Sequence, residues 1–327
     1  MSASLKSYPR VDDWIRLDTP QRVTLRSGKV EIGQRINTAL IMTAAAELSV
    51  DPSRILLSPV ITDEAPDEGM TSGSNSIEQS AEAMRLAAQS ARRHLLALAA
   101  LALDRRREDL FLADGLVRER DGNRSASFWE LLPDGRFDID VDVDASEAAA
   151  LLKEDHATNL REQRAAQLAC GEQQFIHDYQ AHDLLHVRVV RPPHAAARLL
   201  SVNDAQFPVA DGITLVRHGS FLAVAAADEF QAVRAAARLA DAARWDRGVG
   251  IDDRDVFARL RGDPAISLVV VDGTPTDAPL VDVRVRPGEL KTSARAVYER
   301  GYQMHGSIGP SAAMARMSDG VLQVWSH

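Results

Sequence analysis

The sequence predicts an α+β fold, with mixed sheets and packed helices. The apolar residues between Ile77 and Leu98 step by four and three, which indicates one long helix with a single buried stripe. Short alternating segments, typical of half-buried strands, occur before and after this helix. The chain has 327 residues, 45% apolar and 26% charged, which suits a globular protein large enough for two or more cores.

The first third of the chain predicts strand, helix, strand, loop and helix. Alternation from Val23 to Gly33 around a turn at Ser27-Gly28 indicates a hairpin or a bent strand. An amphipathic helix follows from Ile36 to Leu48. The run from Arg54 to Thr62 predicts a buried strand, although Pro59 interrupts it. An acidic, glycine-containing loop from Asp63 to Gly73 then leads to the long helix.

The middle of the chain has a weaker pattern. Three Asp-Gly pairs, which begin at Asp114, Asp121 and Asp134, predict hairpin turns, and residues 146–168 resemble a charged helix. Alternating aspartates from Asp138 to Asp144 first suggest a calcium loop. Ala145 replaces the required glycine and Leu151 the twelfth-position glutamate, so we expect an edge strand with a charged outer face.

A second unit is expected to begin near Phe175. An alanine-rich helix is predicted from Asp228 to Trp245. Strands are predicted at Leu185–Arg191, Ile213–Val216, Phe221–Ala226, Ala294–Tyr302 and Val321–Trp325. His327 ends the chain within an alternating strand pattern, so we expect a truncated or split polypeptide.

Composition excludes several classes of function. The net charge of −9 disfavours nucleic acid as a partner. Cys170, the single cysteine, can form no internal disulfide and cannot hold an iron–sulfur cluster. The longest apolar run, Leu95–Leu103, is far shorter than the roughly 20 residues of a membrane span. Met1–Val11 contains no apolar signal core, so a cytoplasmic location is expected.

Two turns could grip a polar ligand through the backbone. In the first, between a strand and a helix, Gly33 allows close backbone approach and Gln34 offers a donor and an acceptor. In the second, Thr71–Ser76, Ser76 and Gln79 predict a capping box that opens the long helix, a natural anion site. The alternative is that both are ordinary strand-to-helix turns in which the serines only cap.

Other polar clusters have simpler explanations. His177, His182 and His186 have a spacing that could bind zinc, but they do not share a face of the predicted strands. The acidic residues Asp63, Glu64, Asp67 and Glu68 are expected to form a solvated loop. Arg105–Arg107 is interpreted as a charge cluster at a helix C-terminus.

The segments GKVEIGQ (28–34) and TSGSNSIEQSAEAMR (71–85) resemble the pterin-gripping segments of molybdenum hydroxylase large subunits, in the xanthine dehydrogenase and aldehyde oxidase family. Their order resembles the nicotinate and isoquinoline dehydrogenase branch. Residues 175–178, 185–193 and 219–245 are similar to the α/β hammerhead domain of that family, and residues 302–327 to the opening of its first molybdopterin domain.

The resemblance implies a domain organisation and a set of cofactor contacts. Residues 1–113 would be an N-terminal molybdopterin-binding half-domain, 114–170 a connecting region, 171–247 the hammerhead domain and 248–327 the truncated start of the first molybdopterin-binding domain. The residues that it implies for holding the molybdenum cofactor are Gly33, Gln34, Gly73, Ser74, Asn75 and Ser76, with Gln303 and His305 near the metal ligands.

The resemblance also implies a reaction and partners. The family hydroxylates an electron-poor carbon of an N-heteroaromatic ring or aldehyde with oxygen from water. Its catalytic glutamate lies beyond the equivalent of His327, so we expect no catalytic residue in this chain and no activity from the chain alone. The expected partners are the rest of the large subunit or a split-gene product, a [2Fe-2S] small subunit and a small-molecule substrate. The cofactor variant, with the cytosine dinucleotide form among the candidates, is left open.

Three departures from the family pattern leave an alternative function. Arg35 stands where a second glycine is usual and could crowd the cofactor or pair with its phosphate. Ala81 replaces a usual glycine, and Gln167 with Ala169–Gly171 replaces the usual lysine and threonine-glycine at the hammerhead entry. The alternative is a non-catalytic or decayed cofactor-binding or assembly protein of the same fold.

Overall fold

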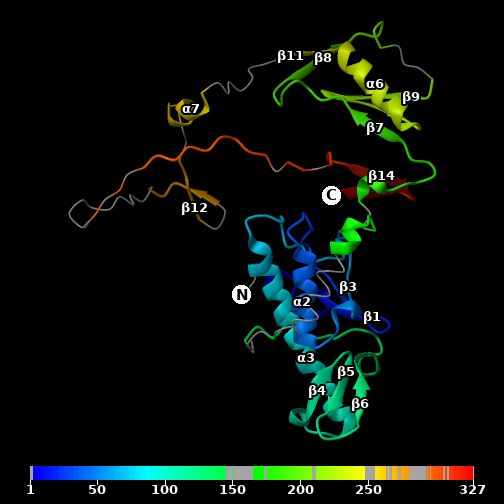
Figure 1. Cartoon of the computed structure of the whole chain (residues 1–327), viewed down its shortest axis with the longest axis vertical. Coiled ribbons are helices and arrows are strands. Elements are labelled where there is room, and N and C mark those ends of the chain that lie inside the picture. Colours follow the sequence, from blue (N-terminus) through cyan, green and yellow to red (C-terminus); the bar gives the residue numbers. More distant parts are fainter. Residues whose placement is uncertain are drawn as a thin grey trace. The chain divides into compact units, whose positions relative to one another are not determined.

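Contacts divide the chain into two units, Met1–Gln173 and Gln174–His327. The structure is a computed structural model (Figure 1). It describes residues 3–144, 150, 165–172, 175–207, 211–246, 255–262, 264, 267–271, 274–279, 292, 294, 296–304, 306, 307 and 309–326.

The first unit packs two helices against a small mixed sheet. Helices α2 (Ile36–Leu48) and α3 (Glu82–Leu103) lie side by side (Figure 1). Strand β1 (Ile15–Thr19) runs antiparallel to β2 (Arg22–Leu25), and β3 (Ile55–Leu57) runs parallel to β2. The fully buried side chains at this core include Trp14, Leu25, Leu40, Met84 and Leu95. The α+β prediction and both helices are confirmed.

A second sheet lies at the C-terminal end of α3. Its antiparallel strands are β4 (Leu110–Ala113), β5 (Leu116–Glu119) and β6 (Ser125–Ser127), and α4 (Phe128–Leu131) follows. The predicted hairpin turns at Asp114 and Asp121 are confirmed. Buried side chains of this part, such as Phe128, belong to the same core as α2 and α3. Residues expected to connect two domains therefore contribute to the core of the first unit.

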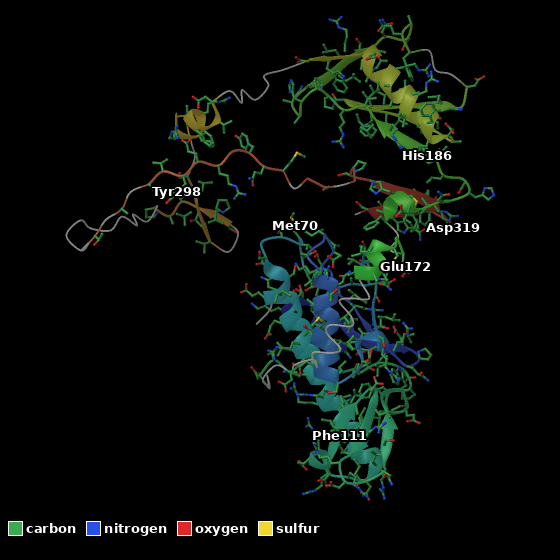
Figure 2. The ribbon with its side chains drawn as sticks, in the orientation of Figure 1. Met70, Phe111, Glu172, His186, Tyr298 and Asp319 are labelled. Atoms are coloured by element: carbon green, nitrogen blue, oxygen red, sulfur yellow. The ribbon has the colours of Figure 1, made fainter. Side chains whose placement is uncertain are left out.

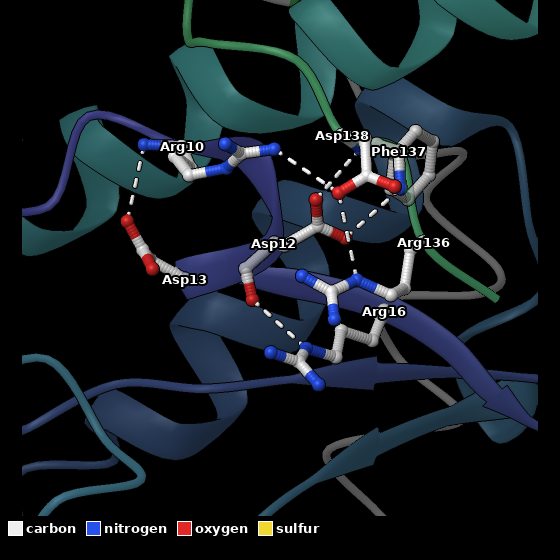
Figure 3. A network of polar contacts seen from close by, with 7 residues as sticks. All are labelled: Arg10, Asp12, Asp13, Arg16, Arg136, Phe137 and Asp138. Carbon is white, nitrogen blue, oxygen red and sulfur yellow. Dashed lines mark hydrogen bonds and ion pairs between the residues drawn. The ribbon is translucent and has the colours of Figure 1, made fainter. Parts of the chain in front are cut away.

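The segment after Gly135 docks on the N-terminus of the unit through a buried carboxylate. Asp12 is 2% exposed, and its carboxylate accepts hydrogen bonds from the backbone N–H groups of Phe137 at 2.9 Å and Asp138 at 2.7 Å (Figure 3). The burial alternation predicted over 138–144 is confirmed, but the pairing is an isolated bridge between Arg10 and Asp140. The predicted edge strand is wrong, because the N–H groups of Phe137 and Asp138 donate to the Asp12 carboxylate instead of to a neighbouring strand.

The second unit contains a three-stranded antiparallel sheet in the order β7–β10–β9, with α6 packed on it. The bounds are β7 His186–Val189, β9 Ile213–His218, β10 Phe221–Ala226 and α6 Glu229–Ala242. Leu222 and Val224 of β10 pack with Leu239 of α6 in a second core. The strands predicted around β7, β9 and β10 are confirmed.

Short elements complete both units. In the first unit they are α1 Ala3–Ser7, η1 Val11–Asp13, η2 Pro52–Arg54, η3 Ser76–Ala81 and η4 Arg107–Asp109. In the second they are η5 Ile176–Asp178, β8 Arg198–Val202, β11 Ala243–Asp246, α7 Val256–Gly262, β12 Val269–Val271, β13 Thr274–Thr276, β14 Ala313–Ser318 and β15 Val321–Ser326. The predicted last strand is confirmed as β15, paired with β14.

Two predictions in the first unit are wrong about where a strand turns or ends. The hairpin turns at Pro20-Gln21 between β1 and β2, not at Ser27-Gly28. Ile32 is 68% exposed and belongs to no strand; its N–H donates to the side chain of Gln34 instead of to a neighbouring strand. The strand predicted to reach Thr62 stops at Leu57, just before Pro59, which has no N–H to donate.

Further predictions fail where pairing partners decide the structure. The alanine-rich helix ends at Ala242 instead of Trp245, because Ala243–Asp246 pairs with β8, which alternation did not reveal. The described residues within 294–302 form no strand, and Tyr298 among them is 92% exposed. The Asp134-Gly135 turn joins no two strands; the carbonyl of Gly135 instead accepts a hydrogen bond from Leu17. Of the helix predicted over 146–168, residues 146–149 and 151–164 lie outside the described residues.

Within the described part of the chain, no helix combines the length and the apolar character needed to cross a membrane.

Candidate functional site

The two segments predicted to bind a ligand follow neighbouring strands at the same edge of the first sheet. The first loop (residues 26–35) follows β2, and the second loop (residues 58–75) follows β3. Since β2 and β3 are parallel neighbours, their C-terminal ends lie together. The N–H of Val30 donates to Oγ1 of Thr71 at 3.1 Å, and η3 contacts α2. The structure thus brings Gly33 and Gln34 into the same region as Gly73–Ser76.

Near the start of α2, the carboxylate of Glu31, a residue of the first loop, accepts hydrogen bonds from backbone N–H groups. Oε1 of Glu31 accepts from the N–H groups of Gly33 at 3.0 Å and Arg35 at 2.8 Å, and Oε2 accepts from Asn37 at 3.3 Å. Gly33 has a φ of +95° and Arg35 a φ of +63°, which turn these N–H groups toward Glu31. The anion position at this helix N-terminus is therefore filled by Glu31.

Gln34 closes the same loop. Its Oε1 accepts from the N–H of Ile32 at 2.7 Å, and its Nε2 donates to the carbonyl of Val30 at 3.0 Å. The side chain is exposed. A carboxamide has two protons and two lone pairs, so one of each remains for a ligand.

The second loop ends in a turn that contains two residues of positive φ. Gly73 and Ser74 have φ values of +64° and +60°, and Asn75 returns to −81°. The N–H of Asn75 donates to the carbonyl of Ser72 at 3.3 Å, which closes this turn. η3 begins at Ser76, and the first N–H groups of a helix have no intrahelical acceptor.

The predicted capping box is wrong. η3 is a π-helix whose N-cap is Asn75, and no side chain caps it. Ser76 therefore lies within the first helical turn instead of before it. Single π turns are frequent at functional sites. Ser80, in the same turn, is 0% exposed, and its Oγ has no hydrogen-bond partner among the described residues.

These donors fit the group that the sequence resemblance implies. The site offers backbone N–H groups, the hydroxyls of Ser74 and Ser76 and the carboxamides of Gln34 and Asn75. Amides and hydroxyls are suitable partners for the oxygen and nitrogen atoms of a pterin phosphate. A Cβ built at Gly33 meets no described atom within 4 Å. Gly33 has a positive φ, and the space beside it leaves room for a ligand to approach the backbone.

The two loops approach each other closely at Gly28. A Cβ at Gly28 would lie 2.1 Å from the carbonyl oxygen of Pro66 in the second loop. Oε2 of Glu68 accepts from Oγ of Ser27 at 2.6 Å and from the N–H of Gly28 at 2.9 Å. Glu68 was expected to be solvated with its acidic neighbours. That prediction is wrong, because its carboxylate compensates two donors at the end of β2.

Lys29 is a second residue that sequence reasoning missed. It is 3% exposed, and its Nζ donates to two carbonyl oxygens of the second loop. The rarity of lysine in the sequence is a weak signal for a special role of Lys29. Only four lysines, Lys6, Lys29, Lys153 and Lys291, occur among the 38 basic residues, so the chain uses arginine almost everywhere else.

Other predicted residues and features lie elsewhere. Gln303 is exposed in the second unit and accepts a hydrogen bond from Arg300, and His305 lies outside the described residues. A cavity of about 510 Å³ in the first unit is lined by Arg54, Gly115, Arg118 and Trp129, among others, but by no predicted site residue. Met70, in the second loop, and Phe111, in β4, lie at opposite ends of this unit (Figure 2).

The first turn of α3, which follows η3 directly, contains an ion pair between Glu82 and Arg85. Arg85 donates to both carboxylate oxygens of Glu82, at 2.9 and 2.7 Å. This hydrogen bonding lowers the pKa of the Glu82 carboxyl and raises the pKa of the Arg85 guanidinium. The negative charge at the start of α3 also interacts favourably with the helix dipole.

Comparison with known proteins yields one family and several partial relatives. The family described as "Molybdopterin cofactor-binding domain" matches residues 4–171, just over half of the 327 residues. A nicotinate dehydrogenase subunit from Pseudomonas putida is 32% identical over 314 residues, which cover 92% of this chain and 25% of that protein. The chain therefore spans about a quarter of the length of this relative.

Solved structures are similar to a smaller part. CO dehydrogenase from Oligotropha carboxidovorans is 26% identical, with a TM-score of 0.33, and quinoline 2-oxidoreductase from Pseudomonas putida 86 is 24% identical, with a TM-score of 0.31. Each match covers 36% of this chain and 15% of the other chain. On the family match over residues 4–171, which contain both loops of the site, this chain belongs to the molybdopterin cofactor-binding domain family.

Proposed function

We propose that this chain forms the N-terminal part of a molybdenum hydroxylase large subunit and that its first unit holds part of the molybdenum cofactor. The observation that carries the proposal is the pairing of the two loops at one sheet edge, with Val30 bonded to Thr71, inside the region of the family match. The 32% identity to a nicotinate dehydrogenase subunit supports an N-heteroaromatic substrate.

The two loops have different roles in this proposal. The N–H groups of Gly33, Arg35 and Asn37 are bonded to Glu31, so the anionic phosphate is assigned to residues 73–76 of the second loop. Gly33 and Gln34 hold the pterin, with the free amide proton and lone pair of Gln34 as its partners. When bound, the cofactor supplies the two-electron oxidation that hydroxylates a substrate carbon with oxygen from water.

The later part of the chain is assigned to two further domains of the large subunit. Residues 171–247 are assigned to a hammerhead domain, residues 248–327 to the start of the first molybdopterin-binding domain, and Gln303 and His305 to the surroundings of the cofactor. The rest of the large subunit and a [2Fe-2S] subunit are the proposed partners. The chain alone is then a cofactor-binding part without catalytic activity, and substrate-dependent dye reduction by the purified chain would contradict this.

The test is to express the chain in a host that makes the cofactor and to measure bound molybdenum and pterin. Pterin is measured by the fluorescence of its oxidised form. The wild-type chain should carry both, and replacing Asn75 and Ser76 together by alanine should remove most of the pterin with the circular dichroism spectrum unchanged. Ser72→Ala, an exposed hydroxyl in the same loop, is the matched control and should retain it. A wild-type chain without pterin would refute the proposed function.

A further inference from the structure

Lys29 is a buried cation at the junction of the two loops. Its ammonium donates to the carbonyl oxygens of Glu68 at 2.6 Å and Met70 at 3.1 Å. Within the part of the chain that the structure describes, no carboxylate forms an ion pair with it. Removing an ammonium from water is costly, so the two carbonyl dipoles must provide the compensation. They do so only while residues 68–70 keep this conformation.

The surrounding contacts join the same two stretches of chain. Gly28 packs against the carbonyl of Pro66, and Ser27 is 2% exposed and donates to Glu68. Oγ of Ser27 also accepts from the N–H of Lys29 at 3.2 Å. Side chains and backbone from each of residues 27–29 therefore contact residues 66–70. We name this set of contacts the Lys29–Glu68 contact.

The Lys29–Glu68 contact lies directly before the cofactor-binding residues in both loops. Val30, bonded to Thr71, follows Lys29 in the first loop, and Gly33 comes three residues later. Thr71 follows Met70, and Gly73 comes two residues later. Met70 itself is 83% exposed, so little apolar packing holds this part of the second loop. The polar contacts of Lys29 and Glu68 are consequently important restraints on the path of the second loop toward Ser76.

We propose that Lys29 and Glu68 are positioning residues for the cofactor: they hold residues 66–71 on the end of β2 and thereby place Gly73–Ser76 beside the first loop. This inference rests on the proposed function. In this role the two side chains act through contacts between the loops, which use the ammonium of Lys29 and Oε2 of Glu68.

The experiment compares Lys29→Met with Lys6→Met in the full chain. Methionine keeps an unbranched apolar stem and removes the charge, and Lys6 is exposed in α1. One readout is hydrogen exchange of peptides covering residues 63–76, and the other is bound pterin. For Lys29→Met we expect exchange to be about tenfold faster in this segment, with α3 still protected, and pterin to fall about fivefold or more. Lys6→Met should match the wild type in both.

Glu68→Gln is the second variant, because it keeps the backbone carbonyl that accepts from Lys29 and weakens only the side-chain acceptor. It should shift both readouts in the same direction by a smaller factor, about threefold. The proposal would be overturned if both variants showed wild-type exchange and wild-type pterin content. If Lys29→Met did not fold, wild-type values in Glu68→Gln alone would overturn it. If the wild-type chain carries no pterin, the proposed function fails. The exchange comparison then still decides whether Lys29 holds the second loop.

Discussion

The backbone N–H of Arg35 donates a 2.8 Å hydrogen bond to the carboxylate of Glu31, four residues earlier. Arg35 has a φ of +63°, a left-handed conformation that costs an L-residue free energy because its Cβ approaches the following carbonyl. The bond therefore holds a residue with a bulky side chain in a conformation that favours glycine. Glu31 maintains the shape of the first loop at the expense of strain at Arg35.

Replacing Arg35 by glycine should raise the free energy of unfolding by about 1 kcal/mol, because glycine adopts this φ without strain. The measurement is urea denaturation of the full chain. Arg35→Ala is the control: it removes the guanidinium but keeps the Cβ, so it should show no such gain. Equal stability of the glycine and alanine variants would show that strain at this position is not what limits the loop.

Replacing Asp12 by alanine should lower the free energy of unfolding by about 3 kcal/mol. The change leaves the backbone N–H groups of Phe137 and Asp138 without an acceptor in a buried site, and both bonds involve a charged carboxylate. Asp13→Ala is the comparison. Among the described residues its side chain accepts an exposed hydrogen bond from the N–H of Arg10, so its loss should cost at most about 0.5 kcal/mol. A loss below about 1 kcal/mol for Asp12→Ala would contradict the docking role of Asp12.

Gly28→Ala should separate the two loops. The new Cβ would lie 2.1 Å from the carbonyl oxygen of Pro66, which belongs to backbone and cannot turn aside. We expect a cost of about 3 kcal/mol in urea denaturation and a loss of bound pterin. Gly33→Ala meets open space and suffers only from its φ of +95°, so it should cost about 1 kcal/mol. If the two variants were equally stable, the close approach at Gly28 would have no energetic weight.

His94 should make stability depend on pH near neutrality. Burial lowers the pKa of its imidazole below the ordinary value of 6.5, and the negative charge of Asp12 acts in the opposite direction. The unfolded chain therefore binds the proton more readily. The stability from neutral His94 is complete above about pH 6.5 and decreases as the pH falls toward the lower folded-state pKa.

The check is the urea midpoint of wild type and His94→Gln at about pH 7.5 and 5.5. The wild type should lose more stability than the variant between these two values. Glu82, whose pKa is also lowered, has an ordinary value of 4.5 and loses its contribution only at lower pH. An identical pH dependence in both proteins would rule out His94 as the source.

The helices and the two site loops could be predicted because their signals are local. The 3.6-residue period marks α2 and α3, and the glycines and serines of 28–34 and 71–76 mark turns at the ends of strands. The roles of individual side chains in these loops could not be predicted. Glu31 and Gln34 bond within their own loop, which depends on the φ angles at Gly33 and Arg35.

By itself the sequence determined the α+β class, the main helices, the strands around β7, β9 and β10 and the presence of two glycine-containing loops, to which we assign the candidate site. Only the tertiary structure decided that Ala243–Asp246 is a strand, that Lys29 and Glu68 are joined and that Asp12 binds residues 137–138. The physical reason is the separation of the partners. Periodicity reports on neighbours within a few residues, whereas Lys29 meets its acceptor 39 residues away and Asp12 its donors 125 and 126 residues away. A buried charge is stable only where such distant groups compensate it, and that compensation exists only in the folded chain.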